Sequence, residues 1–390
     1  MKVFVESAYQ NLKKAGEELC GDNVEIIKTP DSTIIVLADG LGSGVKANIL
    51  STMTVKIAST MMKNNMNVEE VVKTMIQTLP VCRIRRLAYS TFTILKVSNK
   101  GDAHLIEFDN PQTFYLKKGK LVKPEVCFRD IEGRRLRESR FAIAEGDQLY
   151  IVSDGVVHAG VGGILNLGWK WENVGHYLER LSKKPRSIYE KIRLLITACA
   201  HLYAQKPGDD ATVVGVEIKS PCIITLFTGP PRDRSMDTRV VKKLVSSEGK
   251  KVVCGGTAAN IVARELKQEI LTDLEFIDPR VPPTGKIKGI DLVTEGVLTL
   301  NRTVELLRNL ELKDSNLVFK TISNNKDGAS LLANLLLNQG THLKLLVGRA
   351  VNPAHQNPNL PEALSLKLKI VKEMAELLEK LGKEVTVEYF

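Results

Sequence analysis

Four aspartates stand beside glycine at the ends of short apolar segments, and a fifth follows one of them directly; these are the residues of this sequence best suited to chemistry. The clearest case is the stretch Thr33–Gly44, where a β-type apolar run ends in Asp39 and three of the next five residues are glycine. Asp-Gly alone commonly makes no more than a turn. The arrangement recurs, however, in Gly21-Asp22, Asp154-Gly155 and Gly208-Asp209-Asp210.

Carboxylates gathered in this way would form a site for hard divalent cations. Oxygen ligands suit Mg²⁺ or Mn²⁺, whereas the scarcity of histidine and the lack of a Cys-x-x-Cys pair disfavour zinc. Two such ions held close together can share a water, lower its pKa and direct the resulting hydroxide at phosphorus. The aspartate set therefore predicts phosphoester hydrolysis, with two Mn²⁺ or Mg²⁺ ions as cofactors.

Short strands are the elements that must position these aspartates. Val24–Ile27 and Thr33–Ala38 are β-type runs separated by a turn, so we expect a hairpin whose outer ends bring Asp22 and Asp39 together. We therefore expect residues 1–219 to form an α+β antiparallel sandwich. The other strands are expected at Val3–Ala8, Thr91–Val97, His104–Phe108, Thr113–Leu116, Phe141–Ala144, Gln148–Val152 and Ala211–Ile218, and the helices at Lys46–Met62, Val68–Leu79 and Ser187–Tyr203.

With these motifs in this order, residues 1–218 resemble the metal-dependent PPM-type (type 2C) protein serine/threonine phosphatases, in particular the bacterial SpoIIE-like branch. The resemblance implies a PPM-type β-sandwich flanked by helices, which hydrolyses phosphoserine or phosphothreonine on a bacterial regulatory protein in signalling. The motifs that carry it are Ala38-Asp39-Gly40-Leu41-Gly42-Ser43-Gly44, Ser90-Thr91-Phe92-Thr93-Ile94-Leu95, Ser153-Asp154-Gly155 and Gly208-Asp209-Asp210-Ala211-Thr212-Val213-Val214.

The resemblance also implies roles for individual residues. Asp39 would bridge the two ions, and Gly40 would contribute its backbone carbonyl. Asp210 would stand behind the metal ligands and orient water or Asp209. The implied metal ligands are Asp22, Asp39, Gly40, Asp154 and Asp209, and the implied catalytic residues are Asp39, Asp154 and Asp209.

The sequence departs from the family pattern on the leaving-group side. Leu41 stands where the eukaryotic branch has a histidine that can protonate the leaving group, so solvent or a metal-bound water would be the acid. His158, four residues after Asp154, is either a catalytic group or a solvent-facing residue of a glycine-rich segment. Slow turnover, or turnover only with an activating partner, is expected. The alternative function is a degenerate phosphatase fold that acts as a ligand-sensing or scaffold protein through its C-terminal domain.

A second domain is expected over residues 220–390, because α and β segments alternate after Ser220-Pro221. The alternation predicts an open, Rossmann-like α/β sheet. The first two strands end in glycine turns that feed helices and would expose backbone N–H groups to a small anionic ligand. Short connections in a docking domain would look the same, so a regulatory, ligand-sensing or docking role stays open. The candidate anion-binding residues are Gly229, Gly255, Gly256 and Thr257.

Composition argues against a membrane protein and against a nucleic-acid-binding protein. No apolar run approaches the roughly 18 residues of a membrane span, so a cytoplasmic protein without a membrane partner is expected. The net charge is +10, but aromatic residues make up only 5% and are not interleaved with the basic clusters, which argues against nucleic-acid binding. The expected partner is a phosphoprotein substrate. The oligomeric state is left open.

Overall fold

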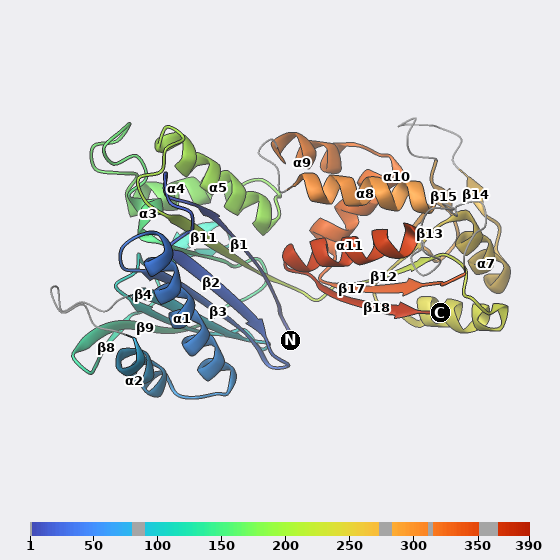
Figure 1. Ribbon diagram of the computed structural model, residues 1–390. Coiled ribbons are helices and arrows are strands. Elements are labelled where there is room, and N and C mark those ends of the chain that lie inside the picture. Colours follow the sequence, from blue (N-terminus) through green and yellow to red (C-terminus); the bar gives the residue numbers. More distant parts are fainter. Residues whose placement is uncertain (1, 80–89, 273–282, 311–314, 351–365) are drawn as a thin grey trace. The chain divides into compact units, whose positions relative to one another are not determined.

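The computed structural model of the chain describes residues 2–79, 90–272, 283–310, 315–350 and 366–390. The chain divides into two units, Met1–Ser220 and Pro221–Phe390 (Figure 1). Each unit has its own sheets and its own buried core. Among the described residues, none of the helices combines the length and apolarity needed to cross a bilayer.

Two antiparallel sheets form the centre of the N-terminal unit. The first has the order β1-β11-β10-β6-β7 and consists of β1 (Phe4–Leu12), β11 (Ala211–Lys219), β10 (Gln148–Val152), β6 (Phe114–Lys117) and β7 (Lys120–Val122). The second has the order β2-β3-β4-β5-β9-β8 and consists of β2 (Asp22–Lys28), β3 (Ser32–Gly40), β4 (Ser90–Ser98), β5 (Asp102–Phe108), β9 (Arg134–Ala142) and β8 (Cys127–Ile131).

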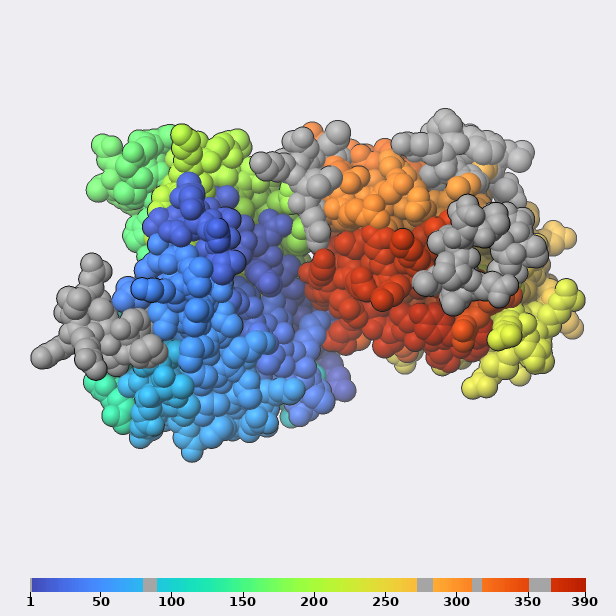
Figure 2. All heavy atoms as spheres, viewed as in Figure 1, coloured from blue at the N-terminus to red at the C-terminus, as the bar shows by residue number. Residues whose placement is uncertain are grey.

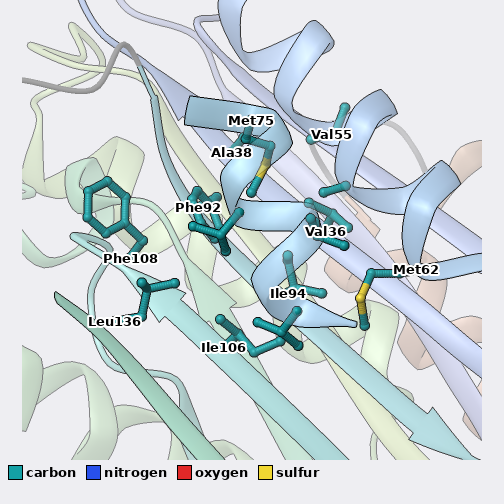
Figure 3. Packing of buried hydrophobic residues seen from close by; sticks show 14 of the residues in the cluster. Val36, Ala38, Val55, Met62, Met75, Phe92, Ile94, Ile106, Phe108 and Leu136 are labelled. Carbon is teal, nitrogen blue, oxygen red and sulfur yellow. The ribbon is translucent and has the colours of Figure 1, made fainter. Parts of the chain in front are cut away.

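Strand β3 shows why the sheets stack. Successive side chains of a strand point to opposite faces. Ile35 and Leu37 accordingly belong to a core shared with Ile151 and Val214 of the other sheet. Val36 and its neighbours on the opposite face pack under the helices instead (Figure 3). Because both faces of β3 are buried, its sequence is apolar almost throughout.

Helices cover the outer faces of the sandwich. In Figure 3, Val55 and Met62 of α1 and Met75 of α2 point toward Val36 and Ala38 of the sheet. The spacing of Asn67 and Glu70 predicts a capping box at the start of α2, and the structure has it: the Asn67 side chain accepts from the Glu70 N–H, and the Glu70 side chain accepts from the Asn67 N–H. Atoms of α1, in blue, form part of the surface that Figure 2 shows. The helices are α1 (Gly44–Lys63), α2 (Val68–Thr78), α3 (Asp154–Val157), α4 (Trp171–Ser182) and α5 (Ile188–Leu202).

The expected α+β mixture is therefore present in this unit, but four elements were not predicted: β7, β8, α3 and α4. The strand expected at Phe141–Ala144 was placed too late, since β9 runs from Arg134 to Ala142. β7 and β8 are edge strands with exposed polar positions, so they lack the apolar alternation that marks a strand. Helix α4 has no start signal, because its N-cap is Lys170 with a positive φ of 68° and no side-chain cap.

The C-terminal unit is built on a seven-stranded sheet of order β14-β15-β16-β13-β12-β17-β18. β16, β13, β12, β17 and β18 pair in parallel, while β14 and β15 add antiparallel strands at one edge. The strands are β12 (Ile223–Thr228), β13 (Lys250–Cys254), β14 (Leu271–Thr272), β15 (Gly285–Lys286), β16 (Leu292–Thr294), β17 (His342–Val347) and β18 (Glu384–Tyr389).

Helices lie on both faces of this sheet. α6 and α7 pack over Phe227, Val253 and Leu346, and α8 and α11 lie on the opposite face (Figure 1). The sequence pattern predicts a helix over Pro361–Leu381; residues 366–380 of it form α11, and residues 361–365 lie outside the described residues. The helices are η1 (Arg234–Met236), α6 (Asp237–Ser246), α7 (Gly256–Leu266), α8 (Val297–Asn309), α9 (Ser315–Asn324), α10 (Gly328–Asn334), η2 (Leu335–Gln339) and α11 (Leu366–Lys380).

Candidate metal site

The hairpin of β2 and β3 places two of the aspartates opposite each other. Asp22 pairs with Asp39 in the antiparallel register, and directly opposed residues have Cβ atoms about 4.5–5.5 Å apart. β3 continues to Gly40, so Asp39 belongs to the strand and not to the turn that follows it. The expected meeting of the two strand ends is therefore observed.

Strands β10 and β11 of the other sheet bring in the remaining aspartates. The Ser153 N–H donates to the Thr212 carbonyl at 3.0 Å, and the Thr212 N–H donates to the Ser153 hydroxyl at 2.8 Å. These bonds join the end of β10 to the start of β11, so Asp154 and Asp209 lie at the same edge. Asp154 is the first residue of the short helix α3.

Asp210 ties the two strand systems together. Its buried carboxylate accepts the Lys14 N–H at 2.9 Å and the Gly21 N–H at 2.8 Å. Hydrogen bonds from backbone N–H groups to a carboxylate are of the stronger, charge-assisted kind. Asp210 therefore fixes the loop that precedes Asp22 against the strand that follows Asp209.

The glycines of the two Asp-Gly pairs are required by close approach and not by turn geometry. A Cβ on Gly40 would lie 2.0 Å from the Ala47 carbonyl oxygen, and a Cβ on Gly155 would lie 2.0 Å from the Asp210 carbonyl oxygen. Neither glycine has a positive φ, whereas Gly42 (108°) and Gly44 (63°) do. At these two Asp-Gly motifs, left-handed backbone thus occurs in the connection from β3 to α1 and not at the glycine that follows the aspartate.

The electrostatics of the cluster are those of acids crowded together. Burial, with the charges of Asp22 and Asp154 added, raises the pKa of Asp39 to about 9. Burial also raises the pKa of Asp22 to about 7, and burial together with Asp209 raises that of Asp154. Among the ion pairs of the described residues, none joins Asp22, Asp39, Asp209 or Asp210 to a lysine or arginine. These carboxylates repel one another unless a cation or protons neutralise them.

The donor set fits a hard divalent ion. Oδ2 of Asp22 is buried and has no hydrogen-bond partner in the described part of the chain. All the clustered side chains offer oxygen ligands, which Mg²⁺ and Mn²⁺ prefer. In the described ranges no three His, Cys, Asp or Glu side chains converge closely enough to hold an ion as they stand.

Other predicted residues lie outside this cluster. The side chain of His158 is 60% exposed, with Nδ1 4.0 Å from Oδ2 of Asp154, so it faces solvent. Gly229 and Gly255 directly follow β12 and β13, with φ of 70° and 117°, and α7 begins at Gly256. Sequence reasoning missed Tyr203, whose hydroxyl donates to the Gly155 carbonyl at 2.8 Å. No local signal identifies Tyr203, since the contact spans 48 residues.

One family model matches the N-terminal part of the chain. Residues 29–219 match the family model of Stage II sporulation protein E (SpoIIE), so the resemblance to the SpoIIE-like PPM-type phosphatases is confirmed. The matched range includes Asp39, Asp154, Asp209 and Asp210 and begins after Asp22. No curated protein matches the chain.

Three solved structures are similar to parts of the chain. The PP2C phosphatase domain with a regulatory-domain fragment of SpoIIE from Bacillus subtilis is 18% identical, with a TM-score of 0.47. That match covers 56% of this chain and 65% of the other, a little under two thirds of its length. The RsbU and RsbW domains of a Mycobacterium tuberculosis protein are 14% identical, with a TM-score of 0.46, and the match covers 62% and 69%. RsbX in complex with magnesium is 18% identical, with a TM-score of 0.41, and the match covers 55% and 96%.

Proposed function

Starting from the SpoIIE-family domain formed by residues 29–219, we propose that this chain is a cytoplasmic, metal-dependent phosphatase. Its substrate is phosphoserine or phosphothreonine on a regulatory protein. The observation that carries the proposal is the cluster of aspartates from two sheets, which form no ion pair with a lysine or arginine among the described residues. Such a cluster binds cations, and phosphoester hydrolysis is the reaction that paired hard cations serve best.

Asp22, Asp39, the Gly40 carbonyl, Asp154 and Asp209 are the proposed ligands of two Mn²⁺ or Mg²⁺ ions. The ions, when bound, supply an acidified water and neutralise the phosphoryl oxygens. The raised pKa of Asp39 supports this role, because a bound cation would offset both the burial and the neighbouring negative charges that disfavour its ionised form.

The chain's own residues hold and orient these ligands. Asp210 positions the loop of Asp22 through the N–H groups of Lys14 and Gly21. Ser153 joins the strands that carry Asp154 and Asp209. Leu41 offers no proton, so the departing serine or threonine oxygen would take its proton from solvent or from a metal-bound water.

The test is hydrolysis of an aryl phosphate and of a phosphoserine peptide by purified protein with Mn²⁺ or Mg²⁺. Asp39→Asn and Asp154→Asn each remove one proposed ligand charge without changing side-chain size, and both should abolish turnover. Asp109→Asn is the matched control, because Asp109 is exposed and its positive φ of 49° suits asparagine. Full activity in both site variants would contradict the proposal, and so would a wild type that is inactive with both Mn²⁺ and Mg²⁺.

The C-terminal unit is proposed to regulate the phosphatase or to recruit its substrate. Its parallel strands have the order third, second, first, fourth, fifth, which is the order of Rossmann-like nucleotide-binding sheets. In such sheets ligands bind beyond the carboxyl ends of the strands, where Gly229, Gly255, Gly256 and Thr257 lie. Calorimetric titration with ATP and with inorganic phosphate tests the anion site. Absence of heat with both probes would leave docking as the role of this unit.

A further inference from the structure

A basic groove runs between the β6–β7 hairpin and helix α4 of the N-terminal unit. We call it the α4 groove; its volume is about 610 Å³. Cationic or ionisable side chains dominate its walls, together with one indole, and none of them belongs to the aspartate cluster. The groove residues used below are Lys118, Lys120, Trp169, His176, Arg180 and Lys183.

The positive charge of the α4 groove is not balanced from within. Glu179 is the single carboxylate on its wall. Oε1 of Glu179 accepts the Leu121 N–H at 2.9 Å, and its other oxygen lies 3.5 Å from the ring of His176. No ion pair among the described residues engages Lys118, Lys120 or Lys183, all of which are exposed. Unpaired cations lining a concave surface concentrate the positive potential there and attract anions.

The shape and chemistry of the groove favour an acidic polypeptide over a nucleic acid. Single-stranded nucleic acids stack on successive aromatic faces, whereas this groove has one indole, Trp169, packed edge-on against Tyr177 at 5.2 Å. A partner cannot add a strand to the edge strand β7, because the outward-facing N–H of Leu121 already donates to the Glu179 carboxylate. A partner must therefore be held by side-chain charge.

The groove is connected to the aspartate cluster by the backbone. The Lys170 N–H, at the start of α4, donates to the Val157 carbonyl at 2.8 Å, and Val157 ends the helix that begins with Asp154. From there α4 continues for twelve residues, or about 18 Å. A chain bound with one residue at Asp154 could thus continue along α4.

We propose that the α4 groove binds an acidic segment of the phosphoprotein substrate, at a distance from the phosphorylated residue. The inference deepens the proposed phosphatase function and rests on it. The groove selects substrates by charge, while the aspartate cluster carries the reaction. Attraction of this kind acts mainly on the rate and specificity of association, and it weakens with salt.

The test compares two phosphoserine peptides that differ only in a run of glutamates or of glutamines, placed about six extended residues from the phosphoserine. In the wild type, kcat/KM should be about tenfold higher for the glutamate peptide at low salt. Lys120→Glu with Lys183→Glu should bring this ratio close to one. Lys63→Glu with Lys100→Glu is the control with the same change in net charge at exposed positions elsewhere in the unit, and it should keep the ratio.

Raising NaCl from about 0.05 M to about 0.5 M should reduce the wild-type ratio toward one, which tests the groove without any substitution. Equal kcat/KM for the two peptides in the wild type, or the same loss of preference in both double variants, would overturn the inference. A separate binding measurement uses fluorescence anisotropy of a labelled glutamate peptide without phosphate. Displacement of this peptide by an equal concentration of single-stranded oligonucleotide would also overturn it.

The binding measurement separates the two proposals. If the wild type hydrolyses neither an aryl phosphate nor a peptide with any metal, the proposed function fails. Weaker peptide binding in the Lys120→Glu, Lys183→Glu variant alone would then still support the acidic-segment site.

Discussion

Replacing Gly155 by alanine tests the claim that close approach, and not turn geometry, dictates the glycine after Asp154. The added Cβ would lie 2.0 Å from the Asp210 carbonyl oxygen and 2.9 Å from its carbon. Real Cβ contacts are essentially never below 3.0 Å, so α3 and the start of β11 must separate by about 1 Å. Both neighbours are backbone atoms, which cannot rotate away as a side chain would.

The expected loss of stability follows from this overlap. Overpacking in a well-packed interior costs about 1–3 kcal/mol, and a clash between two backbones belongs at the upper end. A loss of about 3 kcal/mol lowers the Tm of a unit of this size by roughly 6–12 °C. The Tyr203 hydrogen bond to the Gly155 carbonyl shifts with it.

Urea unfolding followed by tryptophan fluorescence is the assay, because both tryptophans of the chain, Trp169 and Trp171, lie in the N-terminal unit. Gly163→Ala is the matched control in the same segment, since a Cβ there would lie no closer than 3.7 Å to its nearest neighbour, the Gly160 carbonyl oxygen. The free energy of unfolding of this control should stay within about 0.5 kcal/mol of the wild-type value. A Gly155→Ala protein as stable as the control would refute the argument.

Three further predictions concern stability and reactivity. Burial lowers the pKa of His104 from its ordinary 6.5, so the stabilisation that neutral His104 gives the folded state is present above that pH and is lost on acidification. His104→Gln should therefore reduce the fall in the urea unfolding midpoint between about pH 7 and 5, and the same pH dependence in the variant and the wild type would contradict this. Asn67→Ala removes the side-chain cap of α2 and should cost about 1 kcal/mol, while Asn67→Asp retains it; equal unfolding midpoints would show the cap to be irrelevant. Ellman's reagent should label exposed Cys127 in the native protein but Cys199 and Cys254 only on unfolding, since burial raises the pKa of each to about 12; peptide mapping that finds all three labelled at one rate would exclude this.

Local patterns predicted the parts of the site that local patterns can determine. The meeting of Asp22 and Asp39 follows from two alternating runs and one turn, all within 20 residues of sequence. The role of Asp210 could not be read in this way, because its partners Lys14 and Gly21 lie 196 and 189 residues away. The requirement for glycine at position 155 could not be predicted either, because the atom that excludes a side chain there, the Asp210 carbonyl oxygen, comes from a distant part of the sequence.

The same limit applies to whole elements. Helix α2 was predicted because Asn67 and Glu70 form a local capping box, whereas α4 was missed because its first residue has no cap. Three residue pairs with β6 and a hydrogen bond to the Glu179 side chain hold β7 in place. Neither contact can be predicted from the three residues of β7 themselves. Tertiary contacts decide such short edge segments.

The contact between Gly40 and α1 limits the directions in which α1 can move relative to Asp39. The space where a Cβ of Gly40 would stand is already filled by the Ala47 carbonyl oxygen, and the carbon of that carbonyl is only 2.7 Å from the same point. The backbone of helix α1 at Ala47 is therefore already in contact with the backbone of β3 at Gly40. A force on the outer side of α1 cannot press it closer to Asp39; it can only slide the helix along the strand or lift it away.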